Sequence, residues 1–422
     1  MQPKVYLPSE HAIDPALIDT DALQVVRRLR DAGYEAYIVG GSVRDLLIKR
    51  SPKDFDISTS ALPEQIKRVF QRQCIIIGRR FRLAHIRYGH KILEVSTFRS
   101  GLNEGDLITH DNEWGSPVED VMRRDFTING LFYDPSNHSI IDYVGGLDDV
   151  KKMILRTIGD PITRFKQDPV RMIRLLKFRA RTGFEIDGKS RDALLLCREE
   201  ITKSSPARVL EEIFRMLESG ASAPFFMLMT ESRLLELLLP PLAHFLLGAH
   251  GQEIFKYLST ADKINQNDPK HPLDRAMLTA CLLQPILERE IDNHFTSKNH
   301  LPHIGDVMAL TSNVIKAVVG SSFSHFPRRI STIAAYILTT QYRLTPLSGK
   351  RHPRPKLMRM HEFELALKFL KIRSIVNGQH MEAYNFWKNL YRQNDHHHHG
   401  DHRHHIVHKK KSAPETHPPS LI

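Results

Sequence analysis

The sequence predicts an α+β fold, in which a small head containing a β-sheet precedes a mostly helical region and a polar tail. Three observations support this prediction. In the first 145 or so residues, apolar runs of strand length alternate with short helical patterns and Gly-Gly turns. After Gly145-Gly146, strand patterns almost vanish, and residues 160–390 have mostly helical periodicity. Beyond Asn394 the chain is of low complexity and rich in histidine and lysine, which predicts disorder.

The head is expected to begin with a helix over residues 19–33. Asp19 or Thr20 can cap its start, and Gly33 can end it. The other expected elements of the head follow in chain order: strands at 35–39 and 54–59, a helix that opens at Ser60, a strand at 74–77, a hairpin of 83–88 and 91–98 around Gly89-His90, and strands at 126–133 and 139–143.

Composition limits the class of protein. A chain of 422 residues can form two or three domains, and 41% hydrophobic with 26% charged residues is typical of a soluble globular protein. It holds no run of 18 apolar residues, so no membrane span is expected. Three scattered cysteines favour neither a disulfide framework nor a zinc site, and we expect a cytoplasmic protein. The net charge of +12 favours a polyanionic partner such as nucleic acid, although a generally basic surface explains it equally well.

Asp54 and Asp56 are the most informative pair of residues. Side chains at i and i+2 of a strand point to the same face, so the two carboxylates are expected to project together. Such carboxylates repel each other unless a cation lies between them. Mg²⁺ suits this arrangement, because it usually takes one or two protein carboxylates and completes its shell with water and phosphate.

A strand, a Gly-Gly turn and a helix lie just upstream, at residues 37–47. Gly40 and Gly41 would let backbone N–H groups approach a phosphate. A lone Gly-Gly is more often an ordinary turn, and a lone Asp-x-Asp is more often a solvated strand end. Together they indicate phosphoryl or nucleotidyl transfer, and the absence of a G-x-x-x-x-G-K-[S/T] run disfavours a P-loop NTPase.

Two charged motifs follow in register. Residues 123–130 read Arg-Arg-Asp-Phe-Thr-Ile-Asn-Gly, and residues 164–174 open a long helix expected over 165–181. Its basic residues recur every three or four positions, at Arg171, Arg174, Lys177 and Arg181. A plain structural interpretation makes Asp168-Pro169 a helix start, with Asp as the N-cap, and makes the basic stripe a solvated face.

The motifs at 40–45, 54–59, 123–129 and 164–174 together resemble those of the class II tRNA nucleotidyltransferase/poly(A) polymerase family. The resemblance covers at least residues 35–260, in order. It implies a small mixed β-sheet nucleotidyltransferase head followed by an all-helical neck and body. It also implies that a nucleoside monophosphate is transferred without a template to an RNA 3′-hydroxyl, with release of pyrophosphate.

The resemblance implies roles for individual residues. Asp54 and Asp56 would be catalytic and hold two Mg²⁺ ions, with ATP as the substrate. The third carboxylate is expected to be Asp125, with Glu94 on the strand at 93–95 as the competitor. The remaining expected nucleotide-binding residues are Gly40, Gly41, Arg44 and Arg124 for the triphosphate and sugar, and Asp168, Arg171 and Arg174 on the nucleotide-recognition helix, the first two for the adenine edge.

Within the family, residues 75–86 resemble the segment that marks bacterial poly(A) polymerases. We therefore expect a polynucleotide adenylyltransferase that acts in mRNA polyadenylation, RNA processing and decay. The alternatives are a CCA-adding tRNA nucleotidyltransferase and a catalytically silent RNA-binding protein, and the paired carboxylates argue against the silent one. Gln167 departs from the Glu that usually precedes the aspartate of this helix, which leaves base selectivity open.

Four regions are expected from these motifs. They are the catalytic head at 20–160, a helical neck for nucleotide recognition and RNA binding at 161–260, a helical RNA-binding body at 261–393 and a disordered tail at 394–422. RNA 3′ ends and ATP are the expected partners, and proteins of RNA decay are possible ones. A basic segment at 348–356 is expected to be a linker or an RNA-contacting loop.

Overall fold

The computed structural model describes residues 2–78, 82–100, 113–298, 300–323, 326–347 and 355–393. Two compact units divide the chain: Met1–Ile213 with Pro224–Leu238, and Phe214–Ala223 with Leu239–Ile422. The expected tail at 394–422 lies outside the described residues, as do residues 79–81 of the segment that marks poly(A) polymerases and 348–354 of the basic segment. The four regions expected from the motifs remain predictions.

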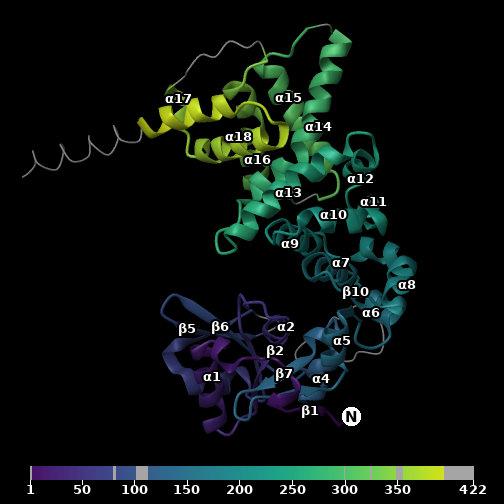
Figure 1. The fold of residues 1–422 in the computed structure, drawn as a ribbon, viewed down its shortest axis with the longest axis vertical. Helices are drawn as coiled ribbons and strands as arrows, with labels where there is room; N and C mark the ends of the chain where they lie inside the picture. Colours follow the sequence, from purple (N-terminus) through teal and green to yellow (C-terminus); the bar gives the residue numbers. More distant parts are fainter. Residues whose placement is uncertain are drawn as a thin grey trace, which may run out of the picture. The chain divides into compact units, whose positions relative to one another are not determined.

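The head is built on a mixed sheet, as predicted (Figure 1). Within the described residues its strand order is β1-β8-β7-β2-β3-β6-β5-β4, and neighbours are antiparallel except for the parallel pair β3 and β6. The strands are β1 Lys4–Tyr6, β2 Ala36–Val39, β3 Asp56–Thr59, β4 Cys74–Ile77, β5 Leu83–Tyr88, β6 Lys91–Thr97, β7 Leu131–Asp134 and β8 Ser139–Asp142. A small parallel pair joins β9 Ile154–Leu155 to β10 Glu185–Ile186.

Helices pack around this sheet and continue beyond it. The first begins at Thr20, where the Asp19 carboxylate accepts the backbone N–H groups of Asp21 and Ala22, so the predicted start is confirmed. Together with α3 it packs on the strands, and Ala22, Val26 and Leu29 are buried. The helices that lie wholly or partly in this unit are α1 Thr20–Asp31, α2 Gly41–Leu47, α3 Pro63–Phe70, α4 Pro117–Met122, α5 Gly146–Lys152, α6 Pro161–Gln167, α7 Val170–Thr182, α8 Gly188–Cys197, α9 Pro206–Leu217, α10 Ser222–Glu231 and α11 Leu234–Leu238.

Four predicted elements differ from the structure. The strand expected at 54–59 begins only at Asp56, the helix expected to open at Ser60 begins at Pro63, and the strand expected at 126–133 starts with a 3₁₀ turn before β7. The helix expected over 165–181 is interrupted between α6 and α7. Pro169 explains this break, because it lacks a backbone N–H and disfavours helical geometry at Asp168, whose φ is −146°.

The sheet face that carries Asp56 is also packed by apolar residues. Strand register places Asp56 opposite Val39 and Ser58 opposite Tyr37, and opposed residues share a face. Val39, Phe98 and Phe132 form a cluster there with Val121 of α4 and Ile158. The rings of Phe98 and Phe132 stack with centroids 6.1 Å apart. Val39 of this cluster lies opposite Asp56, so the cluster packs this face of the sheet next to Asp56, which is itself exposed.

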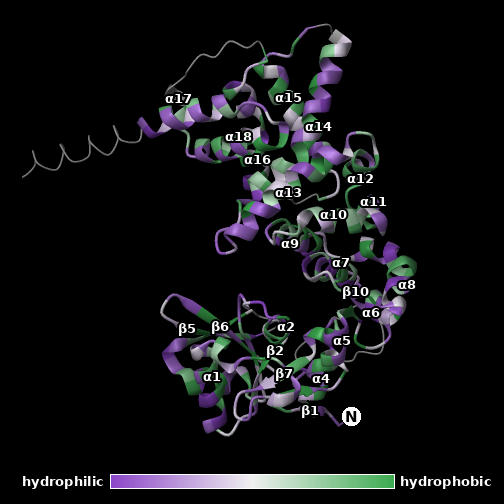
Figure 2. Ribbon diagram, viewed as in Figure 1, coloured by the Kyte–Doolittle hydropathy of each residue, from purple (hydrophilic) through white to green (hydrophobic). Residues whose placement is uncertain are grey.

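The second unit is helical within its described residues. Its helices carry both apolar and polar turns, as expected for helices with one buried face (Figure 2). They are α12 Pro240–Leu247, α13 Gly251–Asn267, α14 Arg275–Lys298, α15 Ile304–Ile315, the π-helical η6 Lys316–Gly320, α16 Arg328–Leu344, α17 Pro355–Met358, α18 Phe363–Asn377 and a final helix over 381–393.

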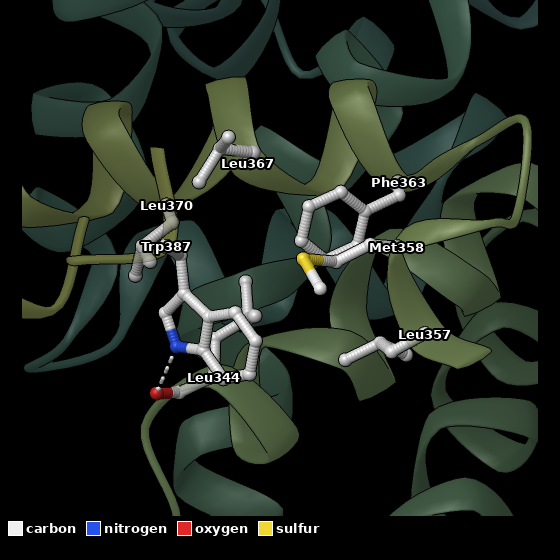
Figure 3. Packing of buried hydrophobic residues seen from close by; sticks show 7 residues of the cluster. All are labelled: Leu344, Leu357, Met358, Phe363, Leu367, Leu370 and Trp387. Atoms are coloured by element: carbon white, nitrogen blue, oxygen red, sulfur yellow. Dashed lines mark hydrogen bonds between the residues drawn. The ribbon is translucent and has the colours of Figure 1, made fainter. Parts of the chain in front are cut away.

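Trp387 fixes the last of these helices to the rest of the unit. Its indole N–H donates a hydrogen bond of 3.0 Å to the carbonyl of Leu344, and its ring packs among buried apolar side chains (Figure 3). These neighbours are Leu344, Leu357, Met358, Phe363, Leu367 and Leu370. A buried Trp with a paired N–H contributes both apolar area and a directional bond.

Among the described helices, none combines the length and the apolar character needed to span a bilayer.

Candidate active site

Asp54 and Asp56 project from the same face at the start of β3. Both residues are exposed, and Phe55 between them is buried, which is the alternation that an extended chain produces. Asp54 lies two residues before the first residue of the strand. The alternation agrees with the predicted common orientation of the two carboxylates, which stays a prediction.

Glu94 is the acid next to this pair. Parallel pairing of Ile57 with Val95 places Asp56 beside Glu94 on the neighbouring strand, and Glu94 is also exposed. Crowding by protein atoms and the negative charges of Glu94 and Asp54 raise the pKa of Asp56 to about 6, against the opposing charge of Arg124. Three carboxylates thus share one end of the sheet, and Glu94 raises the pKa of Asp56 more than Asp54 does.

This group of acids fits a hard cation. Within the part of the chain that the structure describes, no group of three or more Asp, Glu, His or Cys side chains is arranged to hold a metal ion by itself. Mg²⁺ does not require one, because water and substrate phosphate complete its coordination. Desolvation and, after it, the neighbouring negative charges raise the pKa of Asp56, and such a cation would offset the part that comes from charge.

Gly40, the residue that follows β2, lies against the guanidinium of Arg124. Gly40 has φ of +72°, and a Cβ at this position would lie 3.0 Å from Arg124 Nη1, so a larger residue would be strained and crowded. Arg124 donates to Ser58 Oγ at 3.1 Å and to Asp120 Oδ2 at 2.8 Å, and it stacks on Phe132. The structure therefore brings together Gly40, expected at the triphosphate, and Arg124, expected at the sugar–phosphate, and both roles stay predictions.

Arg44 is engaged by protein groups. Its Nη1 donates to Asn129 Oδ1 at 2.6 Å, and its Nε and Nη2 donate to Asp45 Oδ1 at 2.9 and 2.7 Å. The side chain is 5% exposed and its guanidinium lies over Phe178. These contacts favour a structural role that orders the Gly40-Gly41 turn, and a direct contact with the triphosphate stays a prediction.

Asp125 lies in a buried ion-pair cluster. Arg171 Nε is 3.2 Å from Asp125 Oδ1, and Arg174 Nη2 is 2.6 Å from Asp125 Oδ2. Burial disfavours the charged carboxylate, but the guanidiniums of Arg174 and Arg171 outweigh it and hold the pKa of Asp125 below its usual range. Both carboxylate oxygens are thus occupied by arginines, which favours Glu94 over Asp125 as the third carboxylate.

Asp168 is held by a residue far away in sequence. Its Oδ2 accepts a hydrogen bond of 2.9 Å from Arg208 Nη2 on α9. The capping position of α7 belongs to Pro169, and no side chain caps this helix start. The interpretation of Asp168 as an N-cap is therefore wrong, as is the solvated basic face, because Arg171 and Lys177 are buried.

Several polar atoms of this region lack a hydrogen-bond partner within the described chain. The set comprises Arg164 Nε, Asp168 Oδ1, Arg171 Nη1 and Arg174 Nε, all of them buried. Buried polar atoms are rarely left unpaired, so each requires an explanation. Asp168 and Arg171 thus hold one acceptor and one donor that no described group of the protein satisfies.

Arg208, Asp120 and Ser58 were not predicted from the sequence. Arg208 follows Asp168 by forty positions, and no spacing rule connects the two. Arg164 belonged to a predicted motif but had no role assigned. It donates from Nη2 to the carbonyl of Arg124 at 3.0 Å, and burial beside Arg171 lowers its pKa to about 10.

Comparison with known proteins matches three family models in order. They are the poly A polymerase head domain at residues 36–156, a probable RNA and SrmB-binding site of polymerase A at 183–246, and the polymerase A arginine-rich C-terminus at 307–418. A solved structure of a CCA-adding enzyme in an apo form shares the fold, with a TM-score of 0.61 and 17% identity over 93% of this chain and 86% of that one.

Two sequence relatives distinguish the branches. A CCA-adding enzyme of Lactobacillus helveticus is 38% identical over 217 residues, which is 51% of this chain and 54% of that enzyme. Poly(A) polymerase I of Salmonella typhi is 35% identical over 387 residues, which is 87% of this chain and 81% of the relative. The similarity to the polymerase thus extends through head and helical region alike, and the chain belongs to the bacterial poly(A) polymerase family.

Proposed function

We propose that the chain is a template-independent polynucleotide adenylyltransferase that transfers AMP from ATP to RNA 3′ ends and releases pyrophosphate. One observation carries this proposal: the unit that bears the exposed acids Asp54, Asp56 and Glu94 also bears an unpaired acceptor and donor on Asp168 and Arg171. The first group suits metal-assisted phosphoryl transfer, and the second suits recognition of a base.

In this proposal Asp54, Asp56 and Glu94 hold Mg²⁺. When bound, Mg²⁺ would promote attack by the RNA 3′-hydroxyl and neutralise charge on the departing pyrophosphate. The backbone at Gly40 and Gly41 and the guanidinium of Arg124 would receive the triphosphate. Arg124 can act there without rearrangement, because Ser58 and Asp120 already fix its orientation.

Base choice would follow from hydrogen-bond polarity. Adenine presents a donor at its 6-amino group and an acceptor at N1, which match Asp168 Oδ1 and Arg171 Nη1. Guanine and uracil present an acceptor in place of the amino donor and so oppose this arrangement. The other polar atoms of the two side chains have partners, because Arg208 donates to Asp168 Oδ2, and Arg171 donates from Nε to Asp125 and from Nη2 to the carbonyl of Arg123.

The same argument supports CCA addition as a second candidate. Cytosine also presents an amino donor beside a ring acceptor, so this pair of atoms alone admits ATP and CTP. The match to a CCA-adding enzyme over half of the chain points the same way. The match to poly(A) polymerase I over most of the chain favours the first candidate.

A single extension assay separates the candidates. Purified protein is incubated with a labelled RNA primer and Mg²⁺, with each nucleotide alone and with ATP and CTP together. Long ladders with ATP alone support adenylyl transfer, whereas C, C, A followed by a stop on a trimmed tRNA supports the second candidate. No extension under any condition would contradict both candidates and leave an RNA-binding protein.

The proposal also includes roles in mRNA polyadenylation and RNA decay, contacts with decay proteins and a cytoplasmic location.

A further inference from the structure

His85 of β5 is the next side chain along the face that carries the acids. Antiparallel pairing places it opposite Glu94 of β6, and parallel pairing places Glu94 beside Asp56 of β3. Three adjacent strands therefore present Asp56, Glu94 and His85 in a row. His85 Nε2 lies 3.4 Å from Glu94 Oε1.

The exposed fractions of the two side chains indicate that His85 is held in place more firmly than Glu94. The side chain of His85 is 19% exposed and that of Glu94 is 53% exposed, so the histidine is held by its surroundings and the glutamate extends into solvent. A flexible glutamate beside Asp56 would turn away from it, because like charges repel. The contact with His85 opposes this movement, since it attracts one carboxylate oxygen.

We propose that His85 is a positioning residue that keeps the Glu94 carboxylate beside Asp56, so that the cation site is organised before the cation arrives. This inference rests on the proposed function, because it assumes that Glu94 is a ligand. Histidines and carboxylates behind the ligands commonly set metal affinity in this way. The competing interpretation is a cross-strand pair that only stabilises the hairpin of β5 and β6.

The test uses the full-length protein and three variants. His85→Ala removes the contact, His85→Gln keeps an N–H group that can reach Glu94, and His90→Ala is a matched control at the exposed turn of the same hairpin. Binding of Mn²⁺ alone is measured by titration, and electron paramagnetic resonance gives the concentration of unbound Mn²⁺. Extension rates are then measured against Mg²⁺ concentration at saturating ATP.

The expected result is about tenfold weaker Mn²⁺ binding in His85→Ala, in line with losses seen for such supporting residues. The Mg²⁺ concentration for half-maximal rate should rise by a similar factor, while KM for ATP and the rate at saturating Mg²⁺ stay nearly unchanged. His85→Gln should recover most of the affinity, and His90→Ala should match the wild type. If His85→Ala does not fold, His85→Asn replaces it, because its side chain is too short to reach Glu94.

Unchanged Mn²⁺ binding and Mg²⁺ dependence in the folded variant, with only a lower melting temperature, would overturn the inference and leave the hairpin interpretation. Failure of the proposed function is a separate outcome. In that case the wild type extends no RNA primer with any nucleotide, whereas the Mn²⁺ titration of the wild type and of His85→Ala is still measured independently of activity.

Discussion

The first unit contains two acidic sites, and they differ in whether arginines of the protein neutralise the carboxylates. At the end of the sheet, the residues Asp54, Asp56 and Glu94 are exposed, and crowding of the Asp56 carboxylate by protein atoms, together with the negative charges of Glu94 and Asp54, raises the pKa of Asp56 to about 6. At the start of α7, Asp125 is buried between Arg171 and Arg174, and its pKa is held below the usual range. At the first site a cation bound with the substrate could balance the negative charge of the carboxylates. At the second site the guanidiniums of Arg171 and Arg174 already balance the charge of Asp125. Metal-assisted chemistry is therefore expected at the first site, and at the second the role expected of Asp125 is structural.

The largest effect is expected from removing charge at the exposed site. Asp54→Asn and Asp56→Asn should each lower kcat by about a thousandfold or more, since loss of metal-assisted charge stabilisation costs several kcal/mol. RNA affinity should change little. Primer extension and a filter-binding assay measure the two quantities, and Asp148→Asn, at an exposed position of α5, is the matched control. Either variant keeping more than about a tenth of the wild-type kcat would contradict the metal assignment, since several kcal/mol are at stake.

Removing the charge of Asp125 at the buried site should lower the free energy of unfolding. Asp125→Asn leaves the charges of Arg171 and Arg174 uncompensated, and breaking a buried ion pair in this way costs about 3–5 kcal/mol. Urea denaturation should show the loss. Glu94→Gln should behave oppositely, with activity lost and the free energy of unfolding unchanged.

This pair of variants decides which acid is the third ligand. A stable Asp125→Asn protein whose kcat falls as far as that of Asp56→Asn would make Asp125 a ligand, as the family resemblance implies. A fully active Glu94→Gln protein would exclude Glu94. Either result would break the contrast between an open and a closed acidic site.

Local patterns explain which parts of this picture could be predicted. The i, i+2 spacing of Asp54 and Asp56 sets their common face, and the hairpin of β5 and β6 follows from alternation around a turn. The neighbour of Asp56 depends instead on the parallel pairing of β3 with β6, which no local pattern specifies. Contacts over long sequence separations, such as Arg208 with Asp168, are fixed by tertiary packing and were missed for that reason.

An intermediate effect is expected at the base-reading atoms. Asp168→Asn changes the buried acceptor for the amino group of adenine, and Arg171→Lys removes the fork that presents Nη1. A mismatched buried polar pair costs about 1–3 kcal/mol, so the kcat/KM preference for ATP over GTP and UTP should fall about 10- to 100-fold. CTP should lose as much as ATP. Single-nucleotide extension measures all four values, and unchanged ratios in both variants would exclude base reading by these residues.

The smallest effect concerns stability against pH without metal. The pKa of Asp56 is raised in the folded protein, so between about pH 4, its unperturbed range, and pH 6 the folded state binds more protons than the unfolded state. Stability must then fall as pH rises through this window, and the penalty is complete above it. Asp56→Asn removes the penalty, so with EDTA present its melting temperature should exceed that of the wild type at pH 8 and match it at pH 4. Because Asp56 is exposed, the gain should be modest and should shrink with salt. Calorimetry at both pH values measures it. A variant less stable than the wild type at pH 8 would show that the exposed acids are compensated within the protein, as Asp125 is.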